Sequence, residues 1–228
     1  MENLVEQKLF SGIYSGKKVF VTGHTGFKGS WLTYWLEQMG AIVCGYSTKA
    51  PSTPAHIDLL DLKIKSVIGD IRDQKLLEST INDFQPEIVF HLAAQPLVRL
   101  SYKDPIETYE TNVIGSLKVY EACRKCESIT SIVTITTDKI YENKEWQWGY
   151  RENDRLGGKD PYSSSKAAME ILTSSYIHSY FNPNNFKDHN KLVSTVRAGN
   201  VIGGGDWAQD RLIPDILRAL SIQKQNDT

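Results

Sequence analysis

The chain has 228 residues, of which 40% are hydrophobic and 23% charged, and its formal net charge is −1. This length and composition suit one good hydrophobic core with room for a small second lobe, and the near-zero charge gives no electrostatic reason to expect binding to nucleic acid or to an anionic membrane. The first ten residues, MENLVEQKLF, contain acidic side chains and no long apolar run, so we expect no signal peptide or membrane span and predict a cytoplasmic location.

Apolar runs and helical periods alternate along the chain. Short strands are expected at residues 18–21, 41–46, 65–68, 88–92, 132–136 and 193–197, and helices at residues 28–39, 73–84, 105–125, 162–181 and 211–222. Several of the strands are continuously apolar, which is typical of a parallel sheet covered by helices on both faces. The pattern predicts a doubly wound α/β fold, in which ligands bind beyond the carboxyl ends of the strands.

A glycine-rich segment follows the first strand, with Gly23, Gly26 and Gly29 in a G-x-x-G-x-x-G spacing. Gly23 permits a tight turn, Gly26 lets the backbone approach a pyrophosphate, and Gly29 lets the next helix lie close to the strand. Free N–H groups and the helix dipole then face the anion. The segment predicts a dinucleotide site, to which we also assign the intervening residues Thr25, Phe27 and Lys28.

The ends of the next three strands complete the expected cofactor site. The second strand runs into Lys49 with no acid where NAD enzymes often hold the ribose diol, so the residues alone leave NADP open. Asp70 ends the third strand, where its carboxylate suits an adenine amino group or a helix N-cap. We interpret His91, at the end of the fourth strand, as a packed and hydrogen-bonded histidine. The cofactor residues expected here are Asp70, Ile71, Leu92, Ala93, Ala94 and Gln95.

The three cysteines give no sign of a disulfide framework or a metal site. Their odd number, without a secretion signal, argues against disulfides. Cys123 and Cys126 form a single C-x-x-C with no second pair of ligands, and a structural zinc needs four. We therefore interpret Cys44, Cys123 and Cys126 as ordinary thiols.

Tyr162 and Lys166 lie one helical turn apart, after an irregular segment at residues 141–161. A nearby ammonium lowers the pKa of a phenol and makes it a usable base. The spacing alone is weak evidence, because Tyr14 and Lys18 share it ahead of the first strand, where we assign it no role. Tyr162 gains support from three polar residues at the end of the fifth strand, Thr137, Asp138 and Lys139.

The Thr137–Lys139 segment would face the same crevice as Tyr162. In isolation it is equally well explained as a polar turn with a surface ion pair. Together with the glycine segment and Tyr162, the catalytic interpretation is favoured. A second irregular segment, residues 199–206, follows the last strand and contains three consecutive glycines.

These elements together resemble the extended short-chain dehydrogenase/reductase family, with its Rossmann fold, over nearly the whole chain. The motifs that carry the resemblance are TGHTGFKG, GDIRD, HLAAQ, TNVIG, TTDK, YSSSK and RAGNVIGGGD. The resemblance implies that Thr137, Tyr162 and Lys166 are catalytic and that Tyr162 and Lys166 also hold the cofactor. It implies a structural role near the cofactor for Asn112, and it favours NAD over NADP.

Within that family, an acid–base pair after the threonine is typical of nucleotide-sugar 4,6-dehydratases, whereas epimerases usually have none. Asp138 and Lys139, with the strings GHTGFKGSWL, AAQPLVRLSY, WGYRE and GNVIGGGDWAQDRLIPDILR, resemble the branch that acts on CDP-glucose. The resemblance implies CDP-glucose or a related nucleotide sugar as substrate. The implied substrate contacts are Gln95, Arg99, Thr137, Asn200, Arg211 and Leu212.

The implied reaction is a concealed redox cycle. Tyr162 takes the proton of the sugar 4-hydroxyl, held by Thr137, while hydride leaves C4 for the nicotinamide. Lys166 lowers the Tyr162 pKa and binds the ribose. Lys139, if neutral, or a water that it positions removes the C5 proton, and Asp138, if protonated, supplies a proton to the departing 6-hydroxyl before hydride returns to C6. A neutral Lys139 requires a lowered pKa and a protonated Asp138 a raised one, and both shifts require a site screened from water.

The family resemblance also predicts the domain organisation. Its members run longer than this chain, so we expect a dinucleotide-binding domain over residues 1–198 and, at residues 199–228, the start of a truncated nucleotide-sugar lobe. An active lyase and a cofactor-binding module without turnover both remain open, while an epimerase or reductase is disfavoured by Asp138 and Lys139. The expected assembly is a homodimer or homotetramer through the helices at residues 105–125 and 162–181, with no nucleic-acid or membrane partner.

Overall fold

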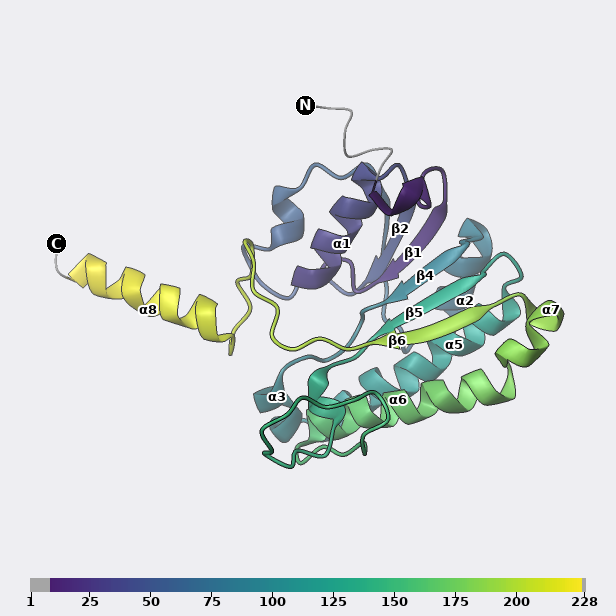
Figure 1. The fold of residues 1–228 in the computed structure, drawn as a ribbon. Helices are drawn as coiled ribbons and strands as arrows, with labels where there is room; N and C mark the ends of the chain where they lie inside the picture. The colour runs from purple at the N-terminus through teal and green to yellow at the C-terminus, as the bar shows by residue number, and fades with distance from the viewer. Residues whose placement is uncertain (1–8, 227–228) are drawn as a thin grey trace.

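A computed structural model describes residues 9–226 as a six-stranded parallel sheet with helices on both faces (Figure 1). The strand order is β3-β2-β1-β4-β5-β6, so the chain reverses its direction of travel across the sheet between β1 and β4. The strands are β1 (Lys18–Thr22), β2 (Ile42–Ser47), β3 (Lys65–Ile68), β4 (Ile88–His91), β5 (Ser131–Ile135) and β6 (Leu192–Val196). The predicted doubly wound fold is confirmed, and its switch point places a ligand site beyond β1 and β4.

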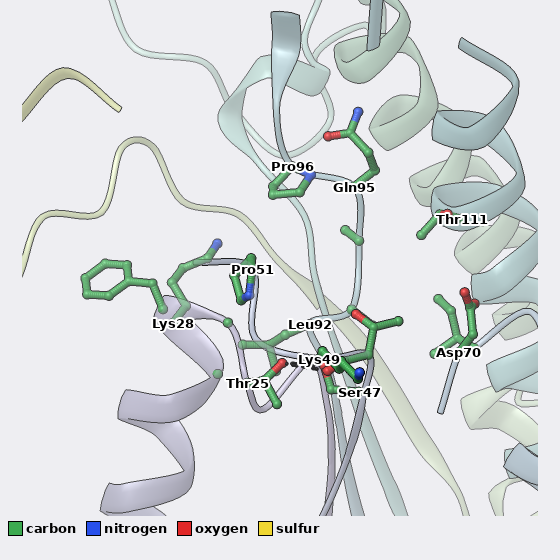
Figure 2. A pocket seen from close by; sticks show the side chains of 18 of the residues that line it. Thr25, Lys28, Ser47, Lys49, Pro51, Asp70, Leu92, Gln95, Pro96 and Thr111 are labelled. Carbon is green, nitrogen blue, oxygen red and sulfur yellow. Dashed lines mark hydrogen bonds between the residues drawn. The ribbon is translucent and has the colours of Figure 1, made fainter. Parts of the chain in front are cut away.

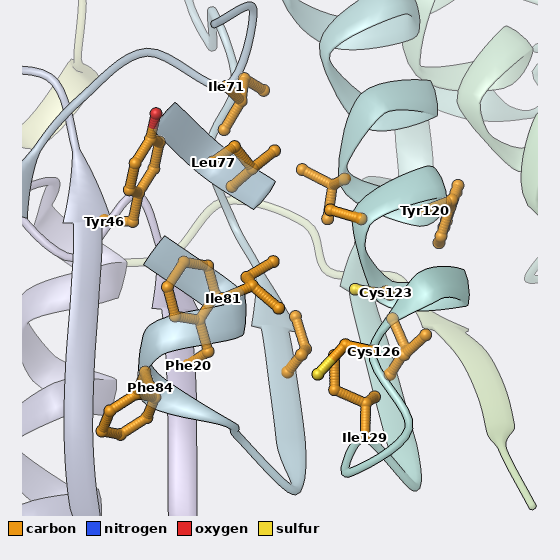
Figure 3. Close-up of a cluster of buried hydrophobic side chains, with 14 of the residues drawn as sticks. Phe20, Tyr46, Ile71, Leu77, Ile81, Phe84, Tyr120, Cys123, Cys126 and Ile129 are labelled. Carbon is orange, nitrogen blue, oxygen red and sulfur yellow. The ribbon is translucent and has the colours of Figure 1, made fainter. Parts of the chain in front are cut away.

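Each face of the sheet has its own hydrophobic layer, which explains the continuous apolar runs. Val19 and Val21 of β1 pack toward α1 (Phe27–Gln38), together with Leu36 of that helix. Phe20, between them, points to the other layer, toward α2 (Gln74–Phe84) and α5 (Ser116–Lys125), as Figure 3 shows. Because strand side chains alternate between faces, a strand covered on both sides must be apolar at every position.

Cys123 and Cys126 lie in this second layer, where both thiols are free and buried (Figure 3). Burial raises the pKa of Cys123 to about 12, with Cys126 adding to the effect. The two residues therefore act as small core side chains.

The predicted helix at residues 105–125 is interrupted. It consists of α4 (Pro105–Tyr109), a π-helical turn (Glu110–Gly115) and α5. A π-turn widens the helix locally and is frequent at functional sites, and this one carries the predicted structural residue Asn112. A further short helix, α3 (Val98–Lys103), was not predicted, because six residues are too few to show a helical period.

The other helices begin and end close to the predicted positions. The longest, α6 (Pro161–Ser179), starts with Asp160, whose side chain caps it by accepting from the Ser163 amide. The remaining elements are α7 (Phe186–His189), α8 (Leu212–Asn226) and the 3-10 turns Leu9–Gly12, His56–Leu59, Asp138–Ile140 and Pro183–Asn185. Figure 1 shows α8 extending away from the sheet.

No helix within the described range is long and apolar enough to cross a membrane. The outer ends of the two predicted domains, residues 1–8 and 227–228, lie outside the described residues.

Candidate active site

The glycine segment forms a turn between β1 and α1, and its three glycines have different roles. Gly23 has φ +76°, and a Cβ there would lie 2.8 Å from the Ala93 amide nitrogen. A Cβ on Gly29 would lie 2.0 Å from the Gly23 carbonyl oxygen, so the helix could not pack so closely. At Gly26 the nearest atom would be 3.4 Å away, which is ordinary contact. No described atom therefore requires glycine at position 26, and we attribute this glycine to the close approach of a ligand.

A cleft of about 310 Å³ opens above this turn, at the carboxyl ends of β1, β2 and β4 (Figure 2). Its lining includes most of the residues predicted to bind a cofactor: Gly23, Thr25, Gly26, Phe27, Lys28, Gly29, Asp70, Ile71, Leu92, Ala93, Ala94 and Gln95. Three predicted cofactor residues, Asn112, Tyr162 and Lys166, are not in its lining.

Other lining residues were not assigned from the sequence. From the sequence, Lys49 was considered only as a contact for a 2′-phosphate. Ser47 joins the end of β2 to the glycine turn, because its Oγ lies 2.8 Å from Thr25 Oγ1. The signal that could have found most of them is topological, because they lie at or just after strand ends, whereas Glu107 and Thr111 come from the helical segment after β4. They are Ser47, Thr48, Lys49, Pro51, Gly69, Arg72, Pro96, Glu107, Thr111 and, in this cleft, Arg211.

Asp70 lies at the rim of this cleft as an ion pair and not as a helix cap. Arg72 Nε and Nη2 donate to its carboxylate at 3.0 and 2.6 Å. These hydrogen bonds hold the pKa of Asp70 below its ordinary value, although burial opposes the effect. The N-cap of α2 is Asp73, which accepts from the Leu76 amide at 3.1 Å. The capping interpretation of Asp70 was therefore wrong, and its contact with adenine stays a prediction.

The buried histidine His91 is a packing residue, as predicted. Its Nδ1 lies 2.7 Å from Thr22 Oγ1 and its Nε2 lies 2.8 Å from Ser116 Oγ. Burial, with a smaller contribution from the charge of Lys166, lowers the pKa of His91 to about 3, so the ring is neutral. Thr22 Oγ1 in turn accepts from the Leu92 amide at 3.1 Å, which fixes the backbone that floors the cleft.

Asn112 connects the loop after β4 to the helix that carries Tyr162. Its Oδ1 accepts from the Gln95 amide at 2.8 Å, and its Nδ2 donates to the Gln95 carbonyl at 3.1 Å and to Ser165 Oγ at 2.9 Å. The Gln95 side chain is itself committed, since it donates to Thr108 Oγ1 at 2.9 Å and to the Leu97 carbonyl at 3.1 Å. Gln95 therefore shapes the cleft with its amide group occupied inside the protein.

Tyr162 and Lys166 are both buried at the start of α6. Burial raises the pKa of Tyr162, while a hydrogen bond with Thr137 and the charge of Arg211 lower it. Burial lowers the pKa of Lys166 to about 7, helped by repulsion from Lys28 and opposed by Glu170. Lys166 Nζ donates to the Ile135 carbonyl at 3.2 Å.

Burial is the largest influence on the Tyr162 pKa, and Thr137 and Arg211 then modify it. The Lys166 ammonium is held by a carbonyl at the end of β5. The role of Lys166 in lowering the Tyr162 pKa stays a prediction.

Asp138 and Lys139 form a 3-10 turn directly after Thr137. Thr137 Oγ1 donates to Asp138 Oδ1 at 3.1 Å and accepts from the Lys139 amide at 3.4 Å. Both charged residues are exposed in the part of the chain that the structure describes, so the screened environment expected for them is not provided by these residues.

A second cleft, of about 710 Å³, adjoins the first. Pro96 and Arg211 line both clefts. Lys139 faces the second one, and four of the predicted substrate residues line it: Arg99, Asn200, Arg211 and Leu212. Gln95 lines only the first cleft, and Thr137 lines neither.

Charged side chains line both clefts, and Lys28 and Arg211 are neighbouring cations in the first. Arg99 Nη1 donates to Asp210 at 3.0 Å across the second cleft. Arg211 Nε is buried and has no hydrogen-bond partner among the described residues. Burial lowers the pKa of Lys28, and the charge of Arg211 lowers it further. Two neighbouring cations in the first cleft, of which Arg211 also lines the second, suit anionic ligands.

Comparison with known proteins shows a family and a fold that the chain shares with them. A family model described as GDP-mannose 4,6 dehydratase matches residues 20–186. CDP-glucose 4,6-dehydratase of Salmonella typhimurium is 56% identical over 214 residues, a match that covers 93% of this chain and 60% of that enzyme. The chain therefore spans less than two thirds of the length of this curated relative.

Two solved structures show the same fold. UDP-glucose 4-epimerase from Thermus thermophilus, in complex with NAD, superposes with a TM-score of 0.73 and 30% identity, over 85% of this chain and 58% of that chain. A dTDP-glucose 4,6-dehydratase from Streptomyces venezuelae, with NAD and TYD bound, gives a TM-score of 0.79 over 90% of this chain and 62% of that chain. Its 23% identity makes it a likeness of fold alone.

Proposed function

We propose that this chain, which belongs to the GDP-mannose 4,6 dehydratase family, dehydrates CDP-glucose with NAD as its cofactor. The product would be CDP-4-keto-6-deoxyglucose, formed without net consumption of the cofactor. The observation that carries the proposal is the position of Lys139. It lies beside Asp138 at the end of β5 and faces a cleft that adjoins the one above the glycine turn.

NAD is proposed for the first cleft because the residues there fit a dinucleotide. The open position at Gly26 leaves room for a diphosphate against the backbone, and Lys28 adds a positive charge at the cleft. When bound, NAD would supply the acceptor and later the donor of a hydride. The epimerase from Thermus thermophilus, solved with NAD, supports NAD over NADP. Lys49 in the lining is the feature that a 2′-phosphate would use.

The sugar is proposed for the second cleft, with proton transfers assigned to three residues and the positioning of the 4-hydroxyl to a fourth. Tyr162 would take the proton of the 4-hydroxyl, whose oxygen Thr137 would hold, since Thr137 is near enough to lower the pKa of Tyr162. Lys139 would remove the C5 proton, directly or through a water, because its side chain faces this cleft. Asp138, beside it, would donate a proton to the departing 6-hydroxyl. The ketone at C4 acidifies C5, so the order of these transfers follows from the chemistry.

The remaining parts of the proposal concern the whole protein. Residues 199–228 would begin a nucleotide-sugar lobe, since residues 200–207 and 210–215 make up much of the second cleft. A homodimer or homotetramer would bury apolar side chains that are exposed on α4, the π-turn and α6: Ile106, Tyr109, Ile114 and Ile171. A cytoplasmic location stays a prediction.

The test is an end-point assay with the purified chain. CDP-glucose and NAD are incubated with it, and the 4-keto sugar is detected by its absorbance in alkali. The expected result is product from CDP-glucose in preference to UDP-glucose, dTDP-glucose and GDP-mannose, with no net NADH. A C4 epimer, or net reduction of NAD, would refute the dehydratase. NAD binding without product would support a cofactor-binding module instead.

Lys139→Met tests the assigned step in the same assay. It should abolish product while NAD binding, measured by calorimetry, stays within about twofold of the wild type, because Lys139 faces only the second cleft. Exchange of the C5 proton with deuterated water should disappear in the variant. Retained turnover would remove Lys139 from the mechanism.

A further inference from the structure

The turn Gly203–Gly205, which follows β6 and lines the second cleft, rests on the helix that begins the cofactor site. Trp31 Nε1, on α1, donates to the Gly204 carbonyl at 2.9 Å. The Trp31 ring also stacks on His56, with ring centroids 4.6 Å apart and an interplanar angle of 23°. An indole that donates a hydrogen bond from one edge and stacks on its face holds its partner in one orientation.

The glycines of this turn are required by contacts with aromatic rings. Gly205 has φ +83°, and a Cβ there would lie 2.2 Å from His56 Cδ2. A Cβ on Gly203 would lie 3.1 Å from Phe27 Cζ. At Gly204 a Cβ would meet no described atom within 4 Å. The outer two glycines therefore permit the backbone to lie against the rings, which a turn free in solvent would not need.

The rings themselves are fixed in place. His56 begins the 3-10 turn His56–Leu59, is buried, and has its Nδ1 2.7 Å from Ser30 Oγ. Ser30 and Trp31 belong to the first turns of α1, and Phe27 is the first residue of that helix. Phe27 also lines the first cleft, so one side chain contacts both the cofactor cleft and the Gly203–Gly205 turn.

We propose that Phe27, Trp31 and His56 form a docking face for the Gly203–Gly205 turn, and that this contact positions one wall of the nucleotide-sugar cleft. The inference rests on the proposed function in taking the second cleft as the sugar site. Trp31 and His56 are positioning residues, since they line neither cleft. The docking face is built largely on α1, and the N-terminus of α1 faces the cofactor cleft. The same helix therefore supports the wall of the sugar cleft and part of the cofactor site.

The docking contact is tested by the indole N–H resonance of Trp31 in the ¹⁵N-labelled chain. The resonance is identified by its loss in Trp31→Phe. Gly205→Ala forces the turn away from His56, so the Trp31 resonance should shift and its exchange with water should become faster. Gly204→Ala is the matched control, because its added methyl group meets open space, and the resonance should keep its position.

The positioning role is tested by binding. Trp31→Ala removes both the hydrogen bond and the stacked ring, so the dissociation constant for CDP-glucose should rise about three- to tenfold, as expected for the loss of one ordered hydrogen bond. The dissociation constant for NAD should stay within about twofold. Trp31→Phe, which keeps a stacking ring, should recover part of the affinity. Trp35→Phe, at an exposed position of the same helix, should match the wild type.

The outcomes separate this inference from the proposed function. A Trp31 resonance that ignores Gly205→Ala would overturn the docking contact whatever the enzyme does. Equal CDP-glucose affinity in Trp31→Ala and wild type would overturn the positioning role. The resonance could respond as expected while neither the wild type nor any variant binds a nucleotide sugar. In that case the docking contact stands, but the proposed function and the assignment of this wall to a sugar cleft both fail.

Discussion

Replacing Glu170 with alanine should destabilise the fold more than removing a charge from the surface. Its carboxylate is buried and accepts from Arg197 Nε and Nη2, both at 3.0 Å, and from the hydroxyls of Thr136 and Thr195. Burial alone would raise the pKa of Glu170, but these hydrogen bonds outweigh it and hold the pKa below its ordinary value. The carboxylate therefore joins β5, β6 and α6 in its charged form.

The size of the effect follows from this burial. Breaking a buried ion pair by removing one partner typically costs about 3 to 5 kcal/mol, because the other charge is left uncompensated. The Arg197 side chain is 20% exposed, so water relieves part of that loss, and we expect about 3 kcal/mol for Glu170→Ala. Glu170→Gln keeps one acceptor oxygen and should cost about 1.5 kcal/mol.

Urea unfolding of the variants measures these costs. The control is Glu78→Ala, which removes the half-buried partner of the exposed Lys125 and should cost less than about 1 kcal/mol. Combining Glu170→Leu with Arg197→Met should cost less than the sum of the single changes, because no lone charge is left buried. A loss below about 1 kcal/mol for Glu170→Ala, or an additive double variant, would refute the reasoning.

The same substitution should move a pH profile. Glu170 lies one turn after Lys166, and its charge raises the Lys166 pKa against burial and Lys28. Glu170→Gln should therefore lower the pKa of Lys166 further below its present value of about 7. If turnover needs the protonated ammonium, the alkaline limb of kcat moves to lower pH, whereas a purely structural role would leave the limb in place.

Three further predictions follow from the site. Gly26→Ala should abolish NAD binding with little change in stability, whereas Gly29→Ala should cost about 3 kcal/mol in thermal unfolding, because its Cβ would overlap backbone. The Lys166 pKa is about 7 in the fold against an ordinary 10.5, so between these values the unfolded chain binds the extra proton and stability rises with pH. Lys166→Met should lose this rise of up to about 1.4 kcal/mol per pH unit in urea unfolding, and should be more stable than wild type at neutral pH. Binding of NAD should take up protons near neutral pH. A diphosphate beside Lys28 would offset the repulsion between Lys28 and Lys166, so the pKa of Lys166 should rise and the amine should gain a proton. Calorimetry in two buffers measures this uptake, and Lys28→Met should reduce it.

The strands could be predicted because burial on both faces imposes a simple pattern. Val19, Phe20 and Val21 supply alternate layers of the core, and this requirement is local to the strand. The glycine turn was equally predictable, since Gly23 is demanded by its φ and Gly29 by its neighbours within the same turn. Such features depend on residues close together in the sequence.

The features that were missed depend on contacts between distant segments. A single π-turn leaves the apolar period of the flanking helices recognisable, so the sequence reads as one helix. Within the turn, Asn112 bonds to Gln95 and Ser165, which lie far from it in the sequence. The direction of Lys166 depends on a carbonyl at the end of β5. The partner of Gly204 is Trp31, 173 positions earlier. The spacing of residues in the sequence predicts none of these contacts, because the groups come together only when the sheet has formed.

The electrostatics of the clefts mark them as a ligand site independently of any similarity to other proteins. Away from the cleft junction, the buried groups of His91, Asn112 and Glu170 each have hydrogen-bond partners on both sides. Beside the clefts, burial lowers the pKa of Lys166 and the charge of Lys28 adds to this effect. Arg211, which lines both clefts, has a buried nitrogen without a partner among the described residues. Such costs persist where function requires them, and a fold selected for stability alone would have replaced the lysine with an apolar side chain. An anion in each cleft would offset them, so the ligands complete the charge balance that the described chain leaves open.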